Sequence, residues 1–319
     1  MLFRLWCAAL MCVCSSVVFA AYPDRPIRLI APFAPGGNID ITARTIAPGL
    51  TEQLGQSVVV ENRGGAGGRI GTEMVAKAAP DGYTLLLGSS GSLTVNPAFA
   101  EVKAYDPLRD FAPTSMVSTV PLLLVVHPAL PVYSAKEFIA LAKSRSGQVM
   151  MASAGTGSNT HLTGELFQVI TGVKLTHIPY KGSGPALVDL IGGQTHCLFD
   201  QVSTSAPHVK AGKLRALAVA SSKRSATLAD VLTMQEAGVR NFEAETYTGV
   251  FLPSAVPKDI VQRVYGALLK VLDQPATREA FNRLGAEVVK STPEEMTTRL
   301  RNDLAKWKKV QQQTGIKLD

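Results

Sequence analysis

The chain has 319 residues, of which 46% are hydrophobic and 18% are charged, and its formal net charge is +7. At about 100–200 residues per domain, this length allows two or three domains. The composition is typical of a folded protein and excludes a disordered or collagen-like chain. The positive charge is mild and forms no dense block. We therefore expect no nucleic-acid binding, whereas a preference for anionic ligands is compatible with this charge.

The first twenty residues have the organisation of a secretory signal peptide. Arg4 supplies a positive charge, and an unbroken apolar run follows over residues 5–14. A membrane anchor needs about 20 apolar residues, and two serines interrupt this run earlier. We therefore expect residues 1–20 to be removed by cleavage near Ala20, which leaves a soluble protein outside the cytoplasm. That protein keeps Cys197 as its single cysteine, and we expect this residue to be buried.

Apolar runs and helix signals predict alternating strands and helices along the mature chain. The first series is strand 27–33, helix 39–54 closed by Gly55, strand 57–61, helix 70–79 and strand 84–88. The second series is strand 122–126, helix 134–144, strand 149–153, helix 160–171, strand 175–178, helix 185–191, strand 196–200, helix 203–211 and strand 214–219. A strand at 248–252 and helices at 258–272, 277–284 and 292–313 complete the chain. The two series predict two α/β domains with largely parallel sheets, buried on both faces because their strands are continuously apolar.

The sequence lacks the common catalytic and metal-binding motifs. It has no His-Glu-x-x-His pair, no Cys-x-x-Cys, no Gly-x-x-x-x-Gly-Lys phosphate loop and no Gly-x-Ser-x-Gly elbow. Its five histidines are scattered without the spacing of metal ligands. We therefore expect no catalytic residue, no bound metal and no cofactor.

Three turns rich in glycine, serine or threonine follow predicted strands, at residues 33–40, 88–92 and 153–160. Ligands of open α/β sheets bind beyond the carboxyl ends of the strands. Helix starts at that edge present free backbone N–H groups and a partial positive charge. Such turns also occur for purely structural reasons, and Asp40 can simply cap a helix. Because the three turns are divided between two predicted domains, they favour a site for an anionic ligand.

Asp200 ends the apolar strand 196–200, where a side chain that faces a cleft is expected. A carboxylate would repel an anionic ligand. Asp200 therefore accepts a hydrogen bond from a ligand amino or hydroxyl group or from a water molecule, or it caps the helix that begins near residue 203. Both interpretations stay open at this point.

Several motifs, taken together and in this order, resemble one known family. They are Tyr22-Pro-x-Arg-Pro-Ile-Arg28, Pro32-Phe-Ala-Pro-Gly-Gly37, Ala76-Lys-Ala-Ala-Pro-Asp-Gly-Tyr-Thr-Leu85, Pro179-Tyr-Lys-Gly-Ser183 and Ala211-Gly-Lys-Leu-Arg-Ala-Leu217. Over essentially the whole mature chain, the sequence resembles the extracytoplasmic substrate-binding receptors of tripartite tricarboxylate transporters, which are the Bug or TctC type.

The resemblance implies an α/β protein with the type II periplasmic-binding-protein fold, in which two lobes enclose a ligand cleft. Lobe 1 would combine residues 21–120 and 246–319, and lobe 2 would be residues 121–245. The implied function is a periplasmic receptor, without catalysis, which captures a small carboxylate and delivers it to membrane permease subunits. We expect this receptor to be a monomer. Two other functions stay open, namely a receptor-fold sensor or interaction protein for a carboxylate and an exported hydrolase that uses a serine or histidine in the cleft.

The resemblance also implies which residues meet the ligand. They are Phe33, Pro35, Gly36, Gly37, Asn38 and Asp40 in the first turn, Ser89, Ser90 and Gly91 in the second, Gly155, Thr156, Ser158, Asn159 and Thr160 in the third, and Asp200 and Tyr247 at the cleft. The family often carries two hydroxyl residues where Asn38 and Ile39 stand here. A hydroxyl donor is therefore replaced by an amide, and the identity of the ligand does not transfer.

Overall fold

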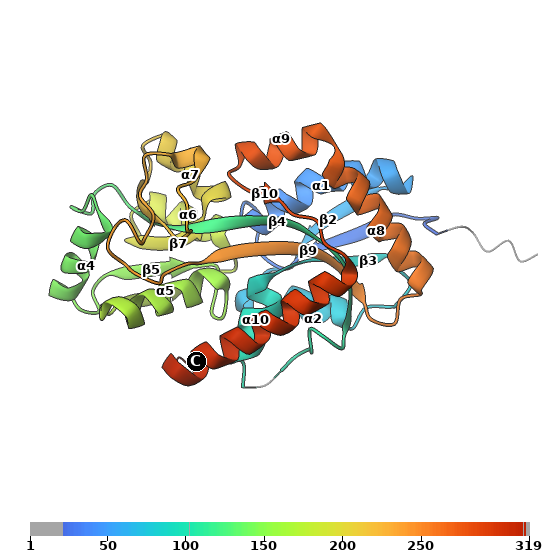
Figure 1. Cartoon of the computed structure of the whole chain (residues 1–319), viewed down its shortest axis with the longest axis horizontal. Helices are drawn as coiled ribbons and strands as arrows, with labels where there is room; N and C mark the ends of the chain where they lie inside the picture. Colours follow the sequence, from blue (N-terminus) through green and yellow to red (C-terminus); the bar gives the residue numbers. More distant parts are fainter. Residues whose placement is uncertain (1–21, 102, 315, 317–319) are drawn as a thin grey trace, which may run out of the picture.

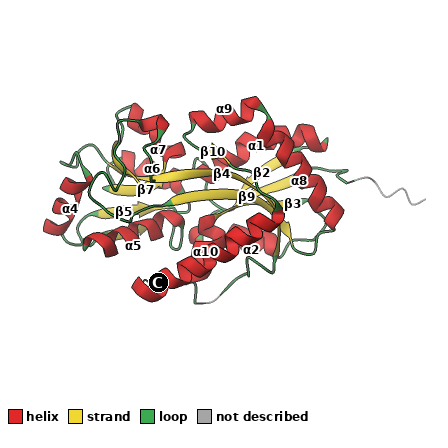
Figure 2. Cartoon of the chain, viewed as in Figure 1, coloured by secondary structure: helices red, strands yellow, loops and turns green. Residues whose placement is uncertain are grey.

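The computed structural model describes residues 22–101, 103–314 and 316 (Figure 1). The predicted signal peptide lies outside the described residues. The described strands form a 10-stranded sheet, in which eight follow the order β2-β1-β3-β9-β4-β7-β5-β6 and two more, β8 and β10, pair with β4. Helices cover both faces of this sheet (Figure 2). None of the described helices has the length and apolar character that crossing a membrane requires.

The first lobe is built around three parallel strands. These strands are β1 (Ile27–Ala31), β2 (Val58–Asn62) and β3 (Thr84–Ser89), and the helices are α1 (Asn38–Leu54), α2 (Arg69–Ala76), α8 (Lys258–Asp273), α9 (Pro275–Arg283) and α10 (Pro293–Thr314). They confirm the first predicted series and the helical tail. Gly55 ends α1 in a left-handed conformation (φ 74°), which glycine adopts without steric cost, and its N–H donates to the Thr51 carbonyl.

The second lobe has the same plan. Its parallel strands are β5 (Met150–Ser153), β6 (Thr176–Pro179) and β7 (Cys197–Gln201), and its helices are α4 (Ala135–Ser144), α5 (Asn159–Thr171), α6 (Ser183–Ile191) and α7 (Val202–Lys210). The predicted capping box is present, because the Ser134 hydroxyl accepts the Glu137 N–H at the start of α4. Cys197 is buried, as predicted. The last strand, β8 (Arg215–Val219), is antiparallel to β4.

Two long antiparallel strands, β4 (Phe111–Val126) and β9 (Glu245–Pro253), connect the lobes. The first part of β4 pairs with β9, and the part after residue 121 pairs with β7 and β8. The sequence predicted only 122–126 and 248–252 as strands, so both predictions were too short. The missed part of β4 contains Pro113 and several hydroxyl residues, which do not form a continuous apolar run. Its polar side chains are satisfied across the sheet, since the Thr114 hydroxyl donates to the Val250 carbonyl at 2.7 Å.

The segment after β3 is helical, whereas the sequence predicted a turn. It forms a π-helical turn, η2 (Gly91–Val95), and the short helix α3 (Asn96–Phe99), both of which are buried. Its glycine, serine, asparagine and proline residues are typical of loops. Helix α10 packs against it and supplies the tertiary contacts that keep it helical. The remaining short elements are η1 (Ala66–Gly68), η3 (Ala226–Leu228) and β10 (Glu287–Val288).

Candidate ligand-binding site

The turn between β1 and α1 is held by Asp40. One carboxylate oxygen of Asp40 accepts the Gly36 N–H at 3.0 Å, and the other accepts Arg44 Nε at 2.9 Å. Burial opposes the charge of Asp40, but the hydrogen bonds from Arg44 and Gly36 together lower the pKa of this carboxyl group. Asp40 is therefore ionised at neutral pH and shapes the turn that precedes α1.

The turns of the two lobes touch each other through their backbones. The Ala34 N–H donates to the Lys181 carbonyl at 2.9 Å. A side chain at Gly184, at the start of α6, would place its Cβ 2.0 Å from the Pro35 carbonyl oxygen. A Cβ at Gly67 would lie 2.3 Å from the Thr156 carbonyl oxygen. Glycine is therefore required at these positions for the lobes to approach this closely.

The start of α5 is fixed by its own hydroxyl groups. The Ser158 hydroxyl caps the helix by accepting the His161 N–H at 3.3 Å. The Thr160 hydroxyl accepts the Ala154 N–H at 2.8 Å and so closes the preceding turn. Asn159 reaches across to β9, where its amide donates to the Glu245 carbonyl and to the Thr246 hydroxyl, both at 2.8 Å.

A small cavity of about 20 Å³, which we call the cleft cavity, lies where these turns meet. Eight of the predicted residues line it, and these are Phe33, Gly37, Asn38, Ser89, Gly91, Ser158, Asn159 and Thr160. It has room for about one water molecule. The lining contains no acidic or basic side chain. Across the described ranges, no group of three or more His, Cys, Asp or Glu side chains is arranged to hold a metal ion.

Three helices begin at the cleft cavity. Helices α1, α5 and α6 begin at Asn38, Asn159 and Ser183, and all three residues line the cavity. The side-chain oxygen of Asn38 accepts the Ser203 hydroxyl at 2.8 Å, which leaves its amide nitrogen buried without a partner. Three helix starts and a free amide donor make this a place where an oxyanion is stabilised without a cationic side chain.

Other predicted residues lie outside the lining of the cleft cavity. Pro35, Gly36, Asp40, Gly155 and Thr156 belong to the surrounding turns, and Ser90 and Tyr247 line a second cavity. Whether they act on a ligand stays a prediction.

Asp200 is fully buried at the start of α7. One of its carboxylate oxygens accepts the hydroxyls of Thr204 at 2.5 Å and Ser205 at 2.7 Å, and the other has no partner. Burial raises the pKa of Asp200, although these hydroxyl donors oppose the shift. The N-cap of α7 is Gln201, and no side chain caps the helix, so Asp200 binds hydroxyls of the first turn and is not the predicted cap. A role of Asp200 toward a ligand stays a prediction.

Several residues of the cleft cavity were not predicted from the sequence, including Ser183, Gln201 and Thr246. The Ser183 hydroxyl donates to the Gln201 side-chain oxygen at 3.4 Å, and the Gln201 amide donates to the Thr246 hydroxyl at 3.1 Å. Ser183 ends a motif of the family resemblance, so a signal for it existed. Gln201 and Thr246 carried no signal, because only the pairing of distant strands brings them here.

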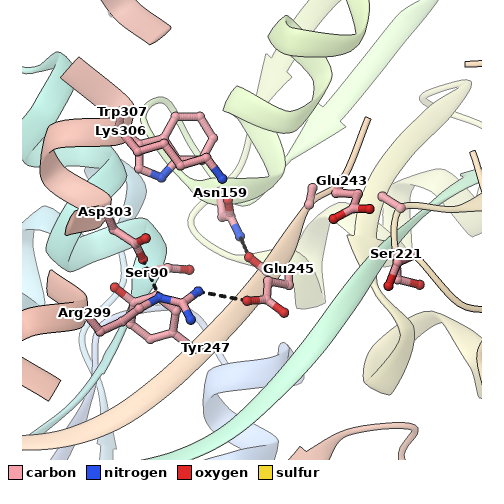
Figure 3. A pocket seen from close by; sticks show the side chains of 13 residues that line it. Ser90, Asn159, Ser221, Glu243, Glu245, Tyr247, Arg299, Asp303, Lys306 and Trp307 are labelled. Atoms are coloured by element: carbon pink, nitrogen blue, oxygen red, sulfur yellow. Dashed lines mark hydrogen bonds and ion pairs between the residues drawn. The ribbon is translucent and has the colours of Figure 1, made fainter. Parts of the chain in front are cut away.

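The second cavity, of about 190 Å³, lies between α10 and the chain segments that border β8 and β9 (Figure 3). Tyr247 lines it, whereas the preceding residue, Thr246, lines the cleft cavity. Since successive side chains of a strand point to opposite faces, these two neighbours on β9 reach different cavities, and the cavities adjoin at Asn159, which lines both. Arg299 crosses the second cavity and pairs with Glu245 at 2.8 Å and with Asp303 at 3.0 Å. This guanidinium is therefore already neutralised by two carboxylates, so the cleft cavity is the better candidate for an anionic ligand.

Comparisons with known proteins agree with the fold and with the cleft between two lobes. The family model described as the tripartite tricarboxylate transporter family receptor matches residues 42–316. The protein BugT of Bordetella pertussis is 43% identical over 93% of this chain and 91% of its own. A structure of an R. palustris protein with adipate has a TM-score of 0.89 and 36% identity, and covers 93% of this chain and 99% of that one. MatC of Rhodopseudomonas palustris with bound malate has a TM-score of 0.88 and 33% identity, and covers 91% and 99%.

Proposed function

The chain belongs to the tripartite tricarboxylate transporter receptor family, and we propose that it captures a small carboxylate and delivers it to the permease subunits of such a transporter. The observation that carries this proposal is the meeting of three helix starts and the free Asn38 amide at the cleft cavity. Similar proteins are solved with adipate and with malate, and both of these ligands are carboxylic acids.

A carboxylate suits the cleft cavity because the lining offers donors and no competing negative charge. Each helix start contributes about 0.3–1 kcal/mol toward an anion, and more where the site is partly buried. Backbone N–H groups near Gly37 and Asn159, and the amide of Asn38, donate to carboxylate oxygens. Neutral donors of this kind hold an anion without a permanent ion pair, which is compatible with release to a second protein.

The cleft cavity does not favour hydrolysis. Its lining has hydroxyl residues but no histidine, lysine or carboxylate that could act as a general base. A Ser153–His177 contact of 2.6 Å exists nearby, but Ser153 has no exposed surface and does not line the cavity. We therefore propose that the protein acts as a receptor without a catalytic step.

The proposal includes closure of the lobes, divided at residues 120/121 and 245/246, on the ligand. β4 and β9 pair over Thr119–Tyr247 and Pro121–Glu245, so any rotation of the lobes must bend these two strands. The cavity is too small for a carboxylic acid in the closed form, so the ligand enters when the lobes separate. We further propose that the receptor works as a monomer.

The function is tested by a thermal-shift screen of residues 21–319 against mono-, di- and tricarboxylates, followed by calorimetry. A ligand at 100 times its Kd adds about 2.7 kcal/mol to the free energy of unfolding, so a true ligand raises the melting temperature by several degrees. Matched amino-alcohols and sugars are the control set, and we expect them to cause no shift. A screen in which no carboxylate exceeds these controls would overturn the proposal.

We also propose that the protein is exported and cleaved near Ala20. N-terminal sequencing of the protein recovered from the periplasm is expected to begin at Ala21 or Tyr22. Recovery of a chain that begins at Met1 would contradict export with cleavage. Replacing three apolar residues of the run 5–14 by aspartate is the control, because it should retain the protein in the cytoplasm.

A further inference from the structure

Two histidines stack against each other beside the loop that leads into α5. The ring centroids of His161, on α5, and His177, on β6, are 3.8 Å apart, and the ring planes differ by 18°. His161 is buried and His177 is half-buried. Two stacked imidazolium ions would repel each other at this distance, so the arrangement favours neutral rings.

Each ring is connected to a backbone N–H of this loop. The Gly157 N–H donates to Nδ1 of His161 at 3.2 Å. The Gly155 N–H donates to the Ser153 hydroxyl oxygen at 3.0 Å, and the same oxygen lies 2.6 Å from Nε2 of His177. The Ser153 oxygen accepts from Gly155 and exchanges a second hydrogen bond with His177, in which either group can be the donor. Because Nδ1 of His161 accepts the Gly157 N–H, the proton of neutral His161 lies on Nε2.

The same loop faces both the ligand and the other lobe. Ala154 and Ser158 line the cleft cavity, and the Thr156 carbonyl packs against Gly67 of the first lobe. Gly155 and Gly157 both have positive φ angles, 119° and 77°, so the loop conformation depends on these two glycines and on the groups that hold their N–H donors.

We propose that His161 and His177 are positioning residues that hold loop 154–158 in its ligand-binding conformation, and that protonation of the pair releases the loop and weakens carboxylate binding. This inference rests on the proposed function. A proton on Nδ1 of His161 would face the Gly157 N–H, donor against donor, and would push that glycine away. A second proton on His177 would make its Nε2 a fixed donor to the Ser153 hydroxyl oxygen, which also accepts the Gly155 N–H.

The charges around the pair determine the direction of the pH effect. Burial lowers the pKa of His177 to about 4, the proximity of His161 adds to this shift, and Glu165 opposes it. Glu165 lies on α5, with a carboxylate oxygen 3.6 Å from Nε2 of His161. His177 is thus neutral at pH 7 and gains its proton only in acid. Its ordinary pKa is 6.5, so the unfolded chain binds the proton first, and the free energy of unfolding falls as the pH drops from 6.5 toward 4.

The test compares three variants with the wild type in malate and adipate calorimetry between about pH 7.5 and pH 4.5. His161→Asn keeps an acceptor near the position of Nδ1 but does not titrate. His161→Phe keeps a stacked ring but removes the acceptor. His208→Gln, on α7, is the matched control. Each affinity is divided by the wild-type value at the same pH, so protonation of the ligand itself cancels.

We expect His161→Asn to bind like the wild type at about pH 7.5 and to bind increasingly more tightly than the wild type as the pH falls toward about 4.5. His161→Phe should be folded and about tenfold weaker at both pH values. The His208→Gln ratio should stay near one. A constant His161→Asn ratio across the range would overturn the inference.

A second readout separates this inference from the proposed function. In NMR spectra of the ligand-free protein, the amide signals of Gly155 and Gly157 should move as the pH falls, and the Gly157 signal should stay in place in His161→Asn. If neither the wild type nor any variant bound a carboxylate at any pH, the proposed function would fail. The two glycine signals would still test whether the histidines hold the loop. Glycine signals that do not respond to pH in the wild type would overturn the inference whatever the protein binds.

Discussion

Asn38 is the side chain that we propose to contact the ligand most directly. It is 4% exposed, its oxygen is held by Ser203, and its amide nitrogen has no partner in the protein. An unpaired buried donor costs about 1–3 kcal/mol, which a ligand oxygen can offset. On the proposed role, Asn38 lowers the stability of the empty protein and raises its affinity for the ligand.

Asn38→Leu tests this role, because it has a similar volume and lacks the donor. We expect carboxylate binding to weaken at least tenfold, or about 1.4 kcal/mol. Asn302→Leu, at an exposed position of α10, is the matched control and should bind normally. Calorimetry that found equal affinities in the two variants would exclude Asn38 from the ligand contacts.

Asp200 allows a prediction about stability. Because burial raises its pKa above the ordinary 3.8, the folded state favours the protonated acid, and the contribution of Asp200 to folding is lost as the pH rises. Asp200→Asn keeps an oxygen that accepts from Thr204 and Ser205 and removes the buried charge. We expect the variant to gain about 1 kcal/mol in the free energy of unfolding at neutral pH, and less near pH 4.

Urea unfolding at two pH values measures this gain, and the carboxylate screen is repeated on the same variant. An unchanged ranking of acids would support the role at the start of α7. A changed ranking would instead show that Asp200 contributes to ligand selectivity. A loss of stability at neutral pH would contradict the effect expected from removing the buried charge.

At the level of elements, the start of α6 controls how closely the lobes approach. Gly184 leaves just enough space for the Pro35 carbonyl, and its backbone conformation suits alanine as well as glycine. Gly184→Ala should therefore preserve the helix but hold the lobes apart, because a Cβ 2.0 Å from a backbone oxygen cannot be accommodated without a shift.

We expect Gly184→Ala to bind carboxylate at least tenfold more weakly while its melting temperature without ligand stays the same or rises. Gly266→Ala, in α8, is the matched control, since a Cβ there meets no atom within 4 Å. The control should bind normally and be slightly more stable. Wild-type affinity in Gly184→Ala would show that ligand binding does not need this contact.

At the level of the whole molecule, we propose that the receptor opens and closes. The Ala34 N–H bond to Lys181 joins the two lobes beside a cleft cavity of about 20 Å³, which is smaller than a carboxylic acid ligand. The empty protein in solution should therefore sample more open forms, and a ligand shifts the population toward this one.

Small-angle scattering of residues 21–319 tests this shift. A compact chain of this length has a radius of gyration of about 19 Å, and we expect the empty protein to exceed the value that it reaches with saturating carboxylate. Gly184→Ala should stay at the larger radius under both conditions. Identical radii for the empty and saturated wild type would contradict an opening of the lobes.

Local patterns in the sequence determined most elements of this protein and the turns that follow β1 and β5. Apolar periodicity, the Ser134 cap and the closing glycine Gly55 act within a few residues, so they can be recognised without a fold. The predicted turns supply eight residues of the cleft cavity, because within each lobe the carboxyl ends of the parallel strands gather at one edge.

Only the tertiary structure decided the long crossing strands, the helical segment after β3 and the remaining cavity residues. Polar residues of β4 become strand because partners such as Val250, far away in the sequence, accept their hydrogen bonds. Gln201 and Thr246 reach the cleft cavity through the pairing of β4 with β7 and with β9, and the hydroxyl partners of Asp200 come from the packed start of α7. Such contacts depend on strand register and on burial, and these are properties of the assembled sheet that no local stretch of sequence specifies.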